Sequence, residues 1–281
     1  MIPGPFEYVR ATSVEEAIGA LVEHGDDAKI LAGGHSLLPL MKLRLAAPTL
    51  LVDLRKVPGM HGIQRENGSW RIGAMTRHAD LQDTPELGVV AKAAGLIADQ
   101  QVRNRGTIGG SLAHGDPASD LPAVLLALEG EVSAQGPNGL RTIPAVELFQ
   151  DYLTTAVAHD EVITEVRLPA DDGWGYGYEK FTRRAEDWAM VGVCALVKRA
   201  GDGSCEDVRI GLTHMGSTPL RATASEEALR GQGLDASSIA AAAQLAAEGT
   251  EPPGDLNATP DYKRHLAQVL TRRALETAAA A

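Results

Sequence analysis

The chain has 281 residues, of which 44% are hydrophobic and 22% charged, and its formal net charge at pH 7 is −11. This length suits two globular domains of ordinary composition, and the negative charge disfavours binding to nucleic acid, which requires a basic face. The two cysteines, Cys194 and Cys205, are too few to hold an iron–sulfur cluster, which normally takes four thiolates, or to build a disulfide framework.

Residues 1–55 alternate between strand and helix patterns. Ser13 and Glu16 have the spacing of a capping box, which predicts that a helix begins there. The apolar face predicted for this helix consists of Val14, Ile18, Leu21 and Val22. Strand patterns cover residues 6–10, 29–32 and 50–53, and a second helical pattern covers 36–45. Strands separated by helices predict a small parallel sheet.

The pattern changes near residue 56. Further strands are predicted from residue 62, and at 70–74, 125–132, 139–143 and 162–168, with a helix at 85–98. Few helices among many strands predict an α+β lobe with mixed or antiparallel pairing over 56–175.

Residues 169–177 have the glycine-rich composition of a linker. Beyond it we expect a small domain over 176–281. Its predicted elements are two antiparallel strands at 190–198 and 206–215, followed by helices at 219–231, 235–248 and 260–278.

A first candidate binding motif is Ala32-Gly33-Gly34-His35-Ser36, which lies between a predicted strand and a predicted helix. Two glycines allow the backbone to turn so that successive N–H groups converge on one point, as in the sites that bind phosphate. The alternative is an ordinary glycine turn that ends the strand.

A second motif, Gly106-Thr107-Ile108-Gly109-Gly110-Ser111, has the same composition. Two such loops favour a dinucleotide whose pyrophosphate is gripped from both sides. The chain contains no G-x-G-x-x-G sequence, so the Rossmann mode of dinucleotide binding is unsupported.

A third motif combines His114, Asp116 and Asp120 with nearby prolines. The spacing fits no standard metal site, and aspartate beside proline is common in turns, so we expect no metal. A carboxylate that accepts a hydrogen bond from a ribose hydroxyl is the preferred interpretation.

The N-terminal residues lack the basic and apolar segments of a signal peptide, and no apolar run reaches the length of a membrane span. We therefore expect a cytoplasmic protein with no membrane span. Association with the inner face of the membrane through partner chains stays open.

The two glycine loops, together with residues 101–105, 119–121, 180–189 and 262–273, resemble the FAD-binding medium subunit of carbon monoxide dehydrogenase and other molybdenum hydroxylases, including xanthine dehydrogenase, over essentially the whole chain. The resemblance implies a two-lobed FAD-binding domain of the vanillyl-alcohol-oxidase (PCMH) type over 1–175 and the flavoprotein C-terminal domain over 176–281. It implies one FAD in this chain.

The resemblance also implies which residues bind the cofactor. Loops 32–36 and 107–111 would hold the pyrophosphate, Asp120 the ribose, while Ile163 and Lys180 would line the flavin and Trp188 would cover it. The full predicted set is Ala32, Gly33, Gly34, His35, Ser36, Leu37, Thr107, Ile108, Gly109, Gly110, Ser111, Asp120, Ile163, Lys180 and Trp188. Ser111 stands where the family often has Asn, which shortens the reach of that contact.

The function implied is electron relay: an oxidoreductase subunit that accepts electrons from iron–sulfur clusters and passes them through FAD to an external acceptor. The clusters would belong to a small partner subunit and the molybdenum cofactor to a large one, in a dimer of heterotrimers. No residue of this chain is assigned as catalytic. Two alternatives are a self-contained flavin oxidase or dehydrogenase and a non-catalytic flavin-binding module. The substrate, whether carbon monoxide, an aldehyde or an N-heterocycle, and the electron acceptor are not specified by the sequence.

In the broader fold class, a histidine placed like His35 can bind flavin covalently, whereas the molybdenum hydroxylase branch holds FAD non-covalently. We favour non-covalent FAD, with His35 as a donor in the phosphate loop.

Overall fold

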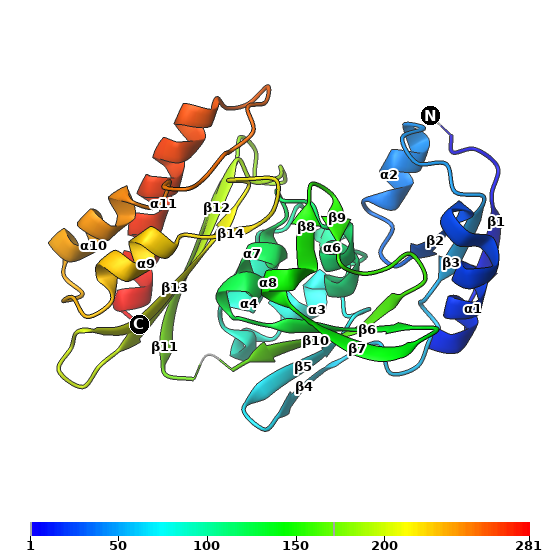
Figure 1. The fold of residues 1–281 in the computed structure, drawn as a ribbon, viewed down its shortest axis with the longest axis horizontal. Helices are drawn as coiled ribbons and strands as arrows, with labels where there is room; N and C mark the ends of the chain where they lie inside the picture. Colours follow the sequence, from blue (N-terminus) through cyan, green and yellow to red (C-terminus); the bar gives the residue numbers. More distant parts are fainter. Residues whose placement is uncertain (1, 171) are drawn as a thin grey trace.

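A three-stranded parallel sheet forms the first lobe of the computed structural model, which describes residues 2–170 and 172–281. Its strand order is β1 (Glu7–Arg10), β3 (Leu50–Asp53), β2 (Ala28–Leu31), with both pairings parallel. The connections carry α1 (Val14–His24), a 3-10 turn at Gly25–Asp27, and α2 (Leu37–Lys42). The predicted parallel sheet is confirmed, and the lobe occupies one end of the molecule (Figure 1).

The start of α1 agrees with the sequence only in part. The Ser13 hydroxyl accepts a hydrogen bond from the N–H of Glu16 at 3.1 Å, as a cap should. The Glu16 carboxylate, however, accepts from the N–H of Thr12 at 2.7 Å instead of completing the capping box with Ser13. Val22, predicted for the buried face, is exposed, and Ala17 occupies that face together with Ile18 and Leu21.

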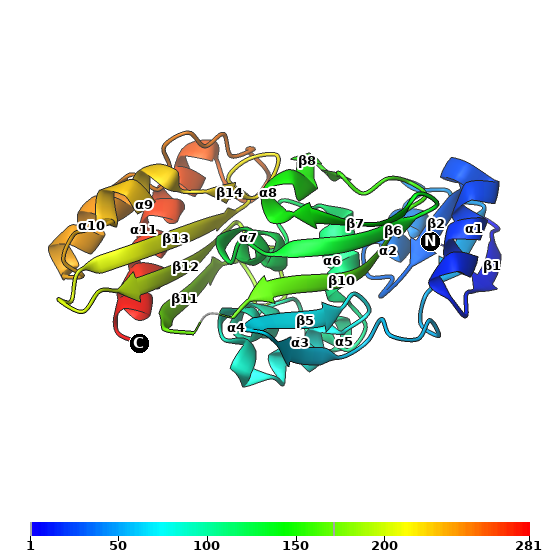
Figure 2. The ribbon, with the colours of Figure 1, turned by 60° about the horizontal axis from the view of Figure 1, so that its bottom comes forward.

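The second lobe contains a five-stranded antiparallel sheet and lies between the first lobe and the C-terminal domain (Figures 1 and 2). In spatial order its strands are β4 (Ile63–Glu66), β5 (Ser69–Gly73), β10 (Val162–Pro169), β6 (Glu131–Gly136) and β7 (Gly139–Pro144). A small hairpin joins β8 (Phe149–Asp151) to β9 (Thr154–Thr155). The helices of the lobe are α3 (His78–Gln82), a 3-10 turn at Pro85–Leu87, α4 (Val89–Gly95), α5 (Gln100–Arg103), α6 (Ile108–His114), α7 (Asp120–Ala127) and α8 (Ala145–Leu148).

The strand predicted at 125–132 is wrong. Residues up to Ala127 belong to α7, and the strand β6 begins only at Glu131. Every residue of α7 is buried, so the helix has no polar face. An apolar run that is buried on all sides shows no periodicity, and a helix of this kind cannot be distinguished from a strand by pattern alone.

The C-terminal domain is a four-stranded antiparallel sheet covered by helices. The strands, in spatial order, are β11 (Trp174–Phe181), β12 (Val191–Arg199), β13 (Cys205–Thr213) and β14 (Leu220–Arg221). The helices are α9 (Thr223–Leu229), α10 (Ala236–Gln244) and α11 (Pro260–Ala279). The predicted fold class, an α+β domain of two lobes followed by antiparallel strands and helices, is confirmed.

Residues 174–177, assigned to a linker from their composition, are strand. The glycines have a packing role there: a Cβ built on Gly177 would lie 2.1 Å from the Ala274 carbonyl oxygen of α11, and one on Gly175 would lie 1.9 Å from that of Ala278. Glycine therefore lets α11 lie directly against β11.

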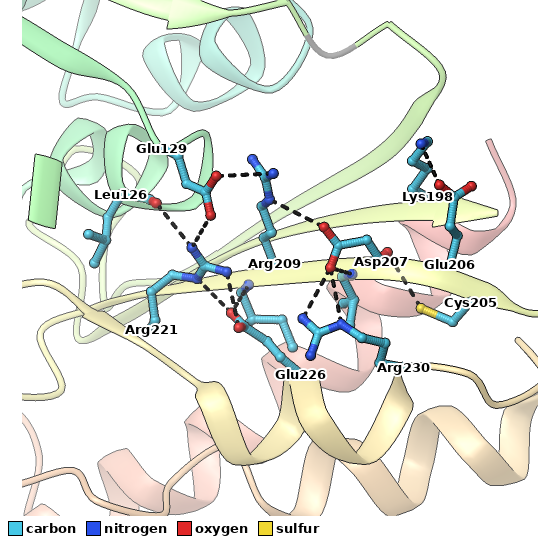
Figure 3. A network of polar contacts seen from close by, with 12 residues as sticks. Leu126, Glu129, Lys198, Cys205, Glu206, Asp207, Arg209, Arg221, Glu226 and Arg230 are labelled. Atoms are coloured by element: carbon cyan, nitrogen blue, oxygen red, sulfur yellow. Dashed lines mark hydrogen bonds and ion pairs between the residues drawn. The ribbon is translucent and has the colours of Figure 1, made fainter. Parts of the chain in front are cut away.

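A network of ion pairs joins the C-terminal domain to the end of α7 (Figure 3). Glu129, just beyond α7, pairs with Arg209 at 3.1 Å and with Arg221 at 3.4 Å. Arg221 also binds the buried carboxylate of Glu226, with its Nε at 2.6 Å. These contacts fix β13, β14 and α9 against the second lobe.

Within the residues that the structure describes, no helix combines the length and the apolar composition needed to cross a membrane.

Candidate functional site

A cavity of about 560 Å³ opens where the two lobes and the C-terminal domain meet. The first lobe contributes β2 and residues 32–37, and the second lobe contributes α6 and the segment around Ile97 and Val102. The C-terminal domain contributes Lys180 and residues 186–188. This volume is in the range of sites that bury a cofactor or drug-sized ligand.

The loop 33–36 offers unused backbone donors to this cavity. Within the described residues, the N–H groups of Gly33, Gly34, His35 and Ser36 have no hydrogen-bond acceptor. Gly34 has a φ of +79°, the left-handed conformation that bends the chain so that successive N–H groups point the same way. Four such groups at a cavity wall are suited to an anion such as a pyrophosphate.

The second loop differs from the nest that the sequence predicts. The N–H of Ile108 donates to the Thr76 carbonyl at 3.0 Å and that of Gly109 to the Ala74 carbonyl at 2.8 Å. The N–H of Gly110 donates to the Thr107 hydroxyl at 3.2 Å, which caps α6. These amides are already satisfied within the protein, so this loop presents mainly its side chains to a ligand.

The two loops are in direct contact, and their glycines make that contact possible. A Cβ built on Gly33 would lie 2.5 Å from the carbonyl oxygen of Arg105 and 2.7 Å from the Cα of Gly106. A Cβ on Gly110 would lie 2.8 Å from the Thr107 hydroxyl oxygen and 3.4 Å from the Cβ of Ala32. The second loop therefore packs directly against the first.

Most of the residues predicted for the site lie together around the cavity. Those that line it are Ala32, Gly33, Gly34, His35, Ser36, Leu37, Thr107, Gly110, Ser111, Asp120, Lys180 and Trp188. Ile108, Gly109 and Ile163 do not line it. Gly109 packs on Ala74, and Ile108 and Ile163 are buried in the hydrophobic core.

Asp120 is engaged by protein groups on both carboxylate oxygens. Oδ1 accepts from the Tyr178 hydroxyl at 2.5 Å, and Oδ2 accepts from the Lys180 ammonium at 2.9 Å. Burial raises the pKa of Asp120 above its ordinary value, and Lys180 and Tyr178 act against that rise. Both carboxylate oxygens that could accept from a ribose hydroxyl therefore already accept a hydrogen bond from within the protein.

The remaining members of the third motif have separate roles. Asp116 accepts from the N–H of Ala118 at 2.8 Å, which is ordinary turn chemistry. His114 lines the cavity, and burial lowers its pKa. No group of three or more potential metal ligands occurs among the described residues.

His78 was missed by sequence reasoning although it lines the cavity. Burial lowers its pKa to about 4, so the imidazole is neutral at physiological pH. A Cβ built on Gly106 would lie 2.7 Å from the His78 ring, which explains why the second loop begins with glycine. The sequence signal was weak because the five-residue helix α3 that carries His78 has no recognisable periodicity.

Trp188 lies at the cavity rim with 55% of its surface exposed. Among the described residues that line the cavity, it is the one with a Trp, Tyr or Phe ring, so we predict that a flat ligand ring stacks there. The FAD that the sequence resemblance implies should therefore quench tryptophan emission when it binds to the purified protein, and Trp188→Ala should remove most of that quenching. Trp70→Phe, which alters a tryptophan outside the cavity, should retain it. Equal quenching in wild type and Trp188→Ala would contradict stacking at this position.

Comparisons with known proteins match the chain throughout. Residues 4–171 match the family described as FAD binding domain in molybdopterin dehydrogenase, and residues 176–278 match the CO dehydrogenase flavoprotein C-terminal domain. The carbon monoxide dehydrogenase medium chain of Hydrogenophaga pseudoflava is 45% identical, over 99% of this chain and 98% of its own length. Subunit alpha of the 6-hydroxypseudooxynicotine dehydrogenase complex of Paenarthrobacter nicotinovorans is 41% identical over 99% of this chain and 96% of its own.

The solved structure of carbon monoxide dehydrogenase from Hydrogenophaga pseudoflava contains a chain that superposes with a TM-score of 0.96 at 46% identity, covering 100% of this chain and 99% of that one.

Proposed function

Since this chain belongs to the FAD-binding family of the molybdopterin dehydrogenases, we propose that it is the FAD-carrying electron-transfer subunit of a molybdenum hydroxylase complex. The observation that carries the proposal is the cavity itself, whose wall at loop 33–36 holds four unused backbone donors. When bound, FAD supplies the redox chemistry, and the chain supplies binding and orientation.

The residues present fit such a ligand. The amides of loop 33–36 would hold the pyrophosphate, and the hydroxyls of Thr107 and Ser111 would complete its surroundings. Trp188 and Lys180, at the wall formed by the C-terminal domain, would lie beside the flavin ring. Burial lowers the pKa of His35, which favours a neutral imidazole that can donate a hydrogen bond in the phosphate loop. We propose non-covalent FAD because the family to which the chain belongs is that of the molybdopterin dehydrogenases.

The proposed partners are a small iron–sulfur subunit and a large molybdenum subunit, doubled to a dimer of heterotrimers. Twofold symmetry is the commonest arrangement of soluble assemblies. The two relatives, one named for carbon monoxide and one for 6-hydroxypseudooxynicotine, are nearly equally similar to this chain. This similarity supports the proposal that another subunit of the complex recognises the substrate.

We also propose that the complex is cytoplasmic. Both cysteines are buried thiols, which is usual in a reducing compartment. The proposed domain division is 1–175 and 176–281, which lies two residues after the start of β11 at Trp174.

The decisive experiment is purification through a tag on this chain from its native host. Two partner chains carrying iron–sulfur clusters and molybdenum should co-purify. Acid precipitation should release about one FAD per chain into the supernatant, as expected for a cofactor held by hydrogen bonds. Flavin that remains in the pellet would contradict non-covalent binding and implicate His35. Substrate oxidation by this chain alone, at the rate of the complex, would favour a self-contained flavoenzyme.

A further inference from the structure

A tyrosine of the C-terminal domain reaches across the domain boundary to a charge beside the cavity. Tyr178, on β11, is 1% exposed, and its hydroxyl donates to Asp120 at 2.5 Å. Asp120 is the first residue of α7, in the second lobe, and is 4% exposed. The tyrosine itself does not line the cavity.

Asp120 in turn holds Lys180, which does line the cavity. The Lys180 ammonium donates to Asp120 at 2.9 Å and to the Leu96 carbonyl at 3.0 Å. An ammonium group has three N–H donors, so one is left for a ligand in the cavity. The side chain of Lys180 is only 5% exposed, and its ion pair with Asp120 compensates the ammonium for the solvation lost on burial.

The orientation of this chain of contacts follows from β11. Because successive side chains of a strand point to opposite faces, Tyr176, Tyr178 and Lys180 share one face of β11. Gly175 and Gly177 lie on the other face, against α11. Gly192, opposite Lys180 on β12, leaves room for the tyrosine: a Cβ there would be 3.2 Å from the Tyr178 hydroxyl oxygen.

We propose that Tyr178 is a positioning residue, which acts through Asp120 to hold the Lys180 ammonium at the cavity wall, where its positive charge favours an electron-rich ligand ring. This inference rests on the proposed function, because the ring in question is that of the bound flavin. The Tyr178 hydroxyl holds Oδ1 of Asp120, which keeps Oδ2 in place to accept from the Lys180 ammonium. Without that hydroxyl, Asp120 is held less firmly, the ammonium is no longer fixed beside the cavity, and the cavity wall becomes less positive. A flavin that gains electrons is then less stable, so its midpoint potential falls.

The test is Tyr178→Phe in the complex purified through this chain, with the flavin potential measured by equilibration against redox dyes. At a fixed solution potential, the ratio of reduced to oxidised flavin should fall about three- to tenfold, the factor that corresponds to the net free energy of one ordinary hydrogen bond. FAD content should stay at the wild-type level. Tyr176→Phe is the matched control, because within the described residues the Tyr176 hydroxyl has no hydrogen-bond partner, and the potential should not change.

A second comparison separates positioning from a general structural effect. In a Lys180→Met background the ammonium is absent, so adding Tyr178→Phe should shift the potential much less than it does in the wild type. An unchanged potential in Tyr178→Phe, or an equal shift in both backgrounds, would overturn the inference. Absence of FAD from the wild-type complex would instead overturn the proposed function on which the inference rests.

Discussion

Gly33→Ala should abolish FAD binding. A Cβ at this position would lie 2.5 Å from the Arg105 carbonyl oxygen and 2.7 Å from the Gly106 Cα, closer than such atoms approach in proteins. Both obstacles are backbone, so the substitution must separate the two loops. The amides of residues 33–36 would then no longer converge on one anion. FAD content of the complex, measured from flavin absorbance after acid release, should fall to near zero.

Gly19→Ala is the control for this substitution. Gly19 lies in α1, and a Cβ there meets nothing within 4 Å. Alanine in a helix is more favourable than glycine by about 0.5–1 kcal/mol, so this variant should retain FAD and gain slightly in stability. Wild-type FAD content in Gly33→Ala would exclude loop 33–36 as the phosphate site.

Glu226→Ala should lower the free energy of unfolding by about 3 kcal/mol, the cost of leaving one member of a buried ion pair without its partner. The Glu226 carboxylate accepts from the Ile210 N–H at 2.7 Å and from two nitrogens of Arg221 at 2.6 and 3.0 Å. Burial by itself lowers the pKa of Arg221, but the hydrogen bonds and charges of Glu226 and Glu129 raise it on balance. Alanine would remove the main group that stabilises this guanidinium.

The measurement is urea unfolding of the purified chain, in which the midpoint should fall by about 1 M or more. Glu227→Ala changes the adjacent, exposed glutamate and should leave the midpoint nearly unchanged. Arg221 also contacts Glu129, just beyond α7. We therefore expect Glu226→Ala to weaken the contact between the second lobe and the C-terminal domain (Figure 3), in addition to destabilising the C-terminal domain itself. Equal midpoints for the two variants would show that the ion pair contributes little to stability.

Local patterns predicted the first lobe well because each of its elements is short and bounded by turn residues. Thus the strands at 7–10, 28–31 and 50–53 were found within one or two residues. The interior of the second lobe was harder. Helix α7 is buried on every side and lacks periodicity, and α3 is too short to show any. The first four residues of β11, 174–177, were assigned to a linker because the glycines that allow contact with α11 have the composition of a loop.

The candidate site, like the fold, could be predicted from local patterns only in part. The glycine pairs predicted both loops. The sequence did not show that amides of the second loop donate to the backbone carbonyl groups of Ala74 and Thr76. Those acceptors lie more than thirty residues earlier and come into reach only through the tertiary fold. For the same reason no local pattern indicated a role for Tyr178, whose partner Asp120 is 58 residues away.

The order in which the cavity residues are synthesised has a consequence for when the cofactor can bind. Its wall is drawn from residues as early as Leu21 and as late as Trp188, with the anion-binding amides near the beginning of that interval. A nascent chain on the ribosome therefore displays the phosphate loop long before β11 and the tryptophan have been made. Since domains generally fold as units during synthesis, capture of the dinucleotide must wait until translation has passed these last elements. We therefore expect FAD to bind only after β11 and Trp188 have been made and have packed against the two lobes.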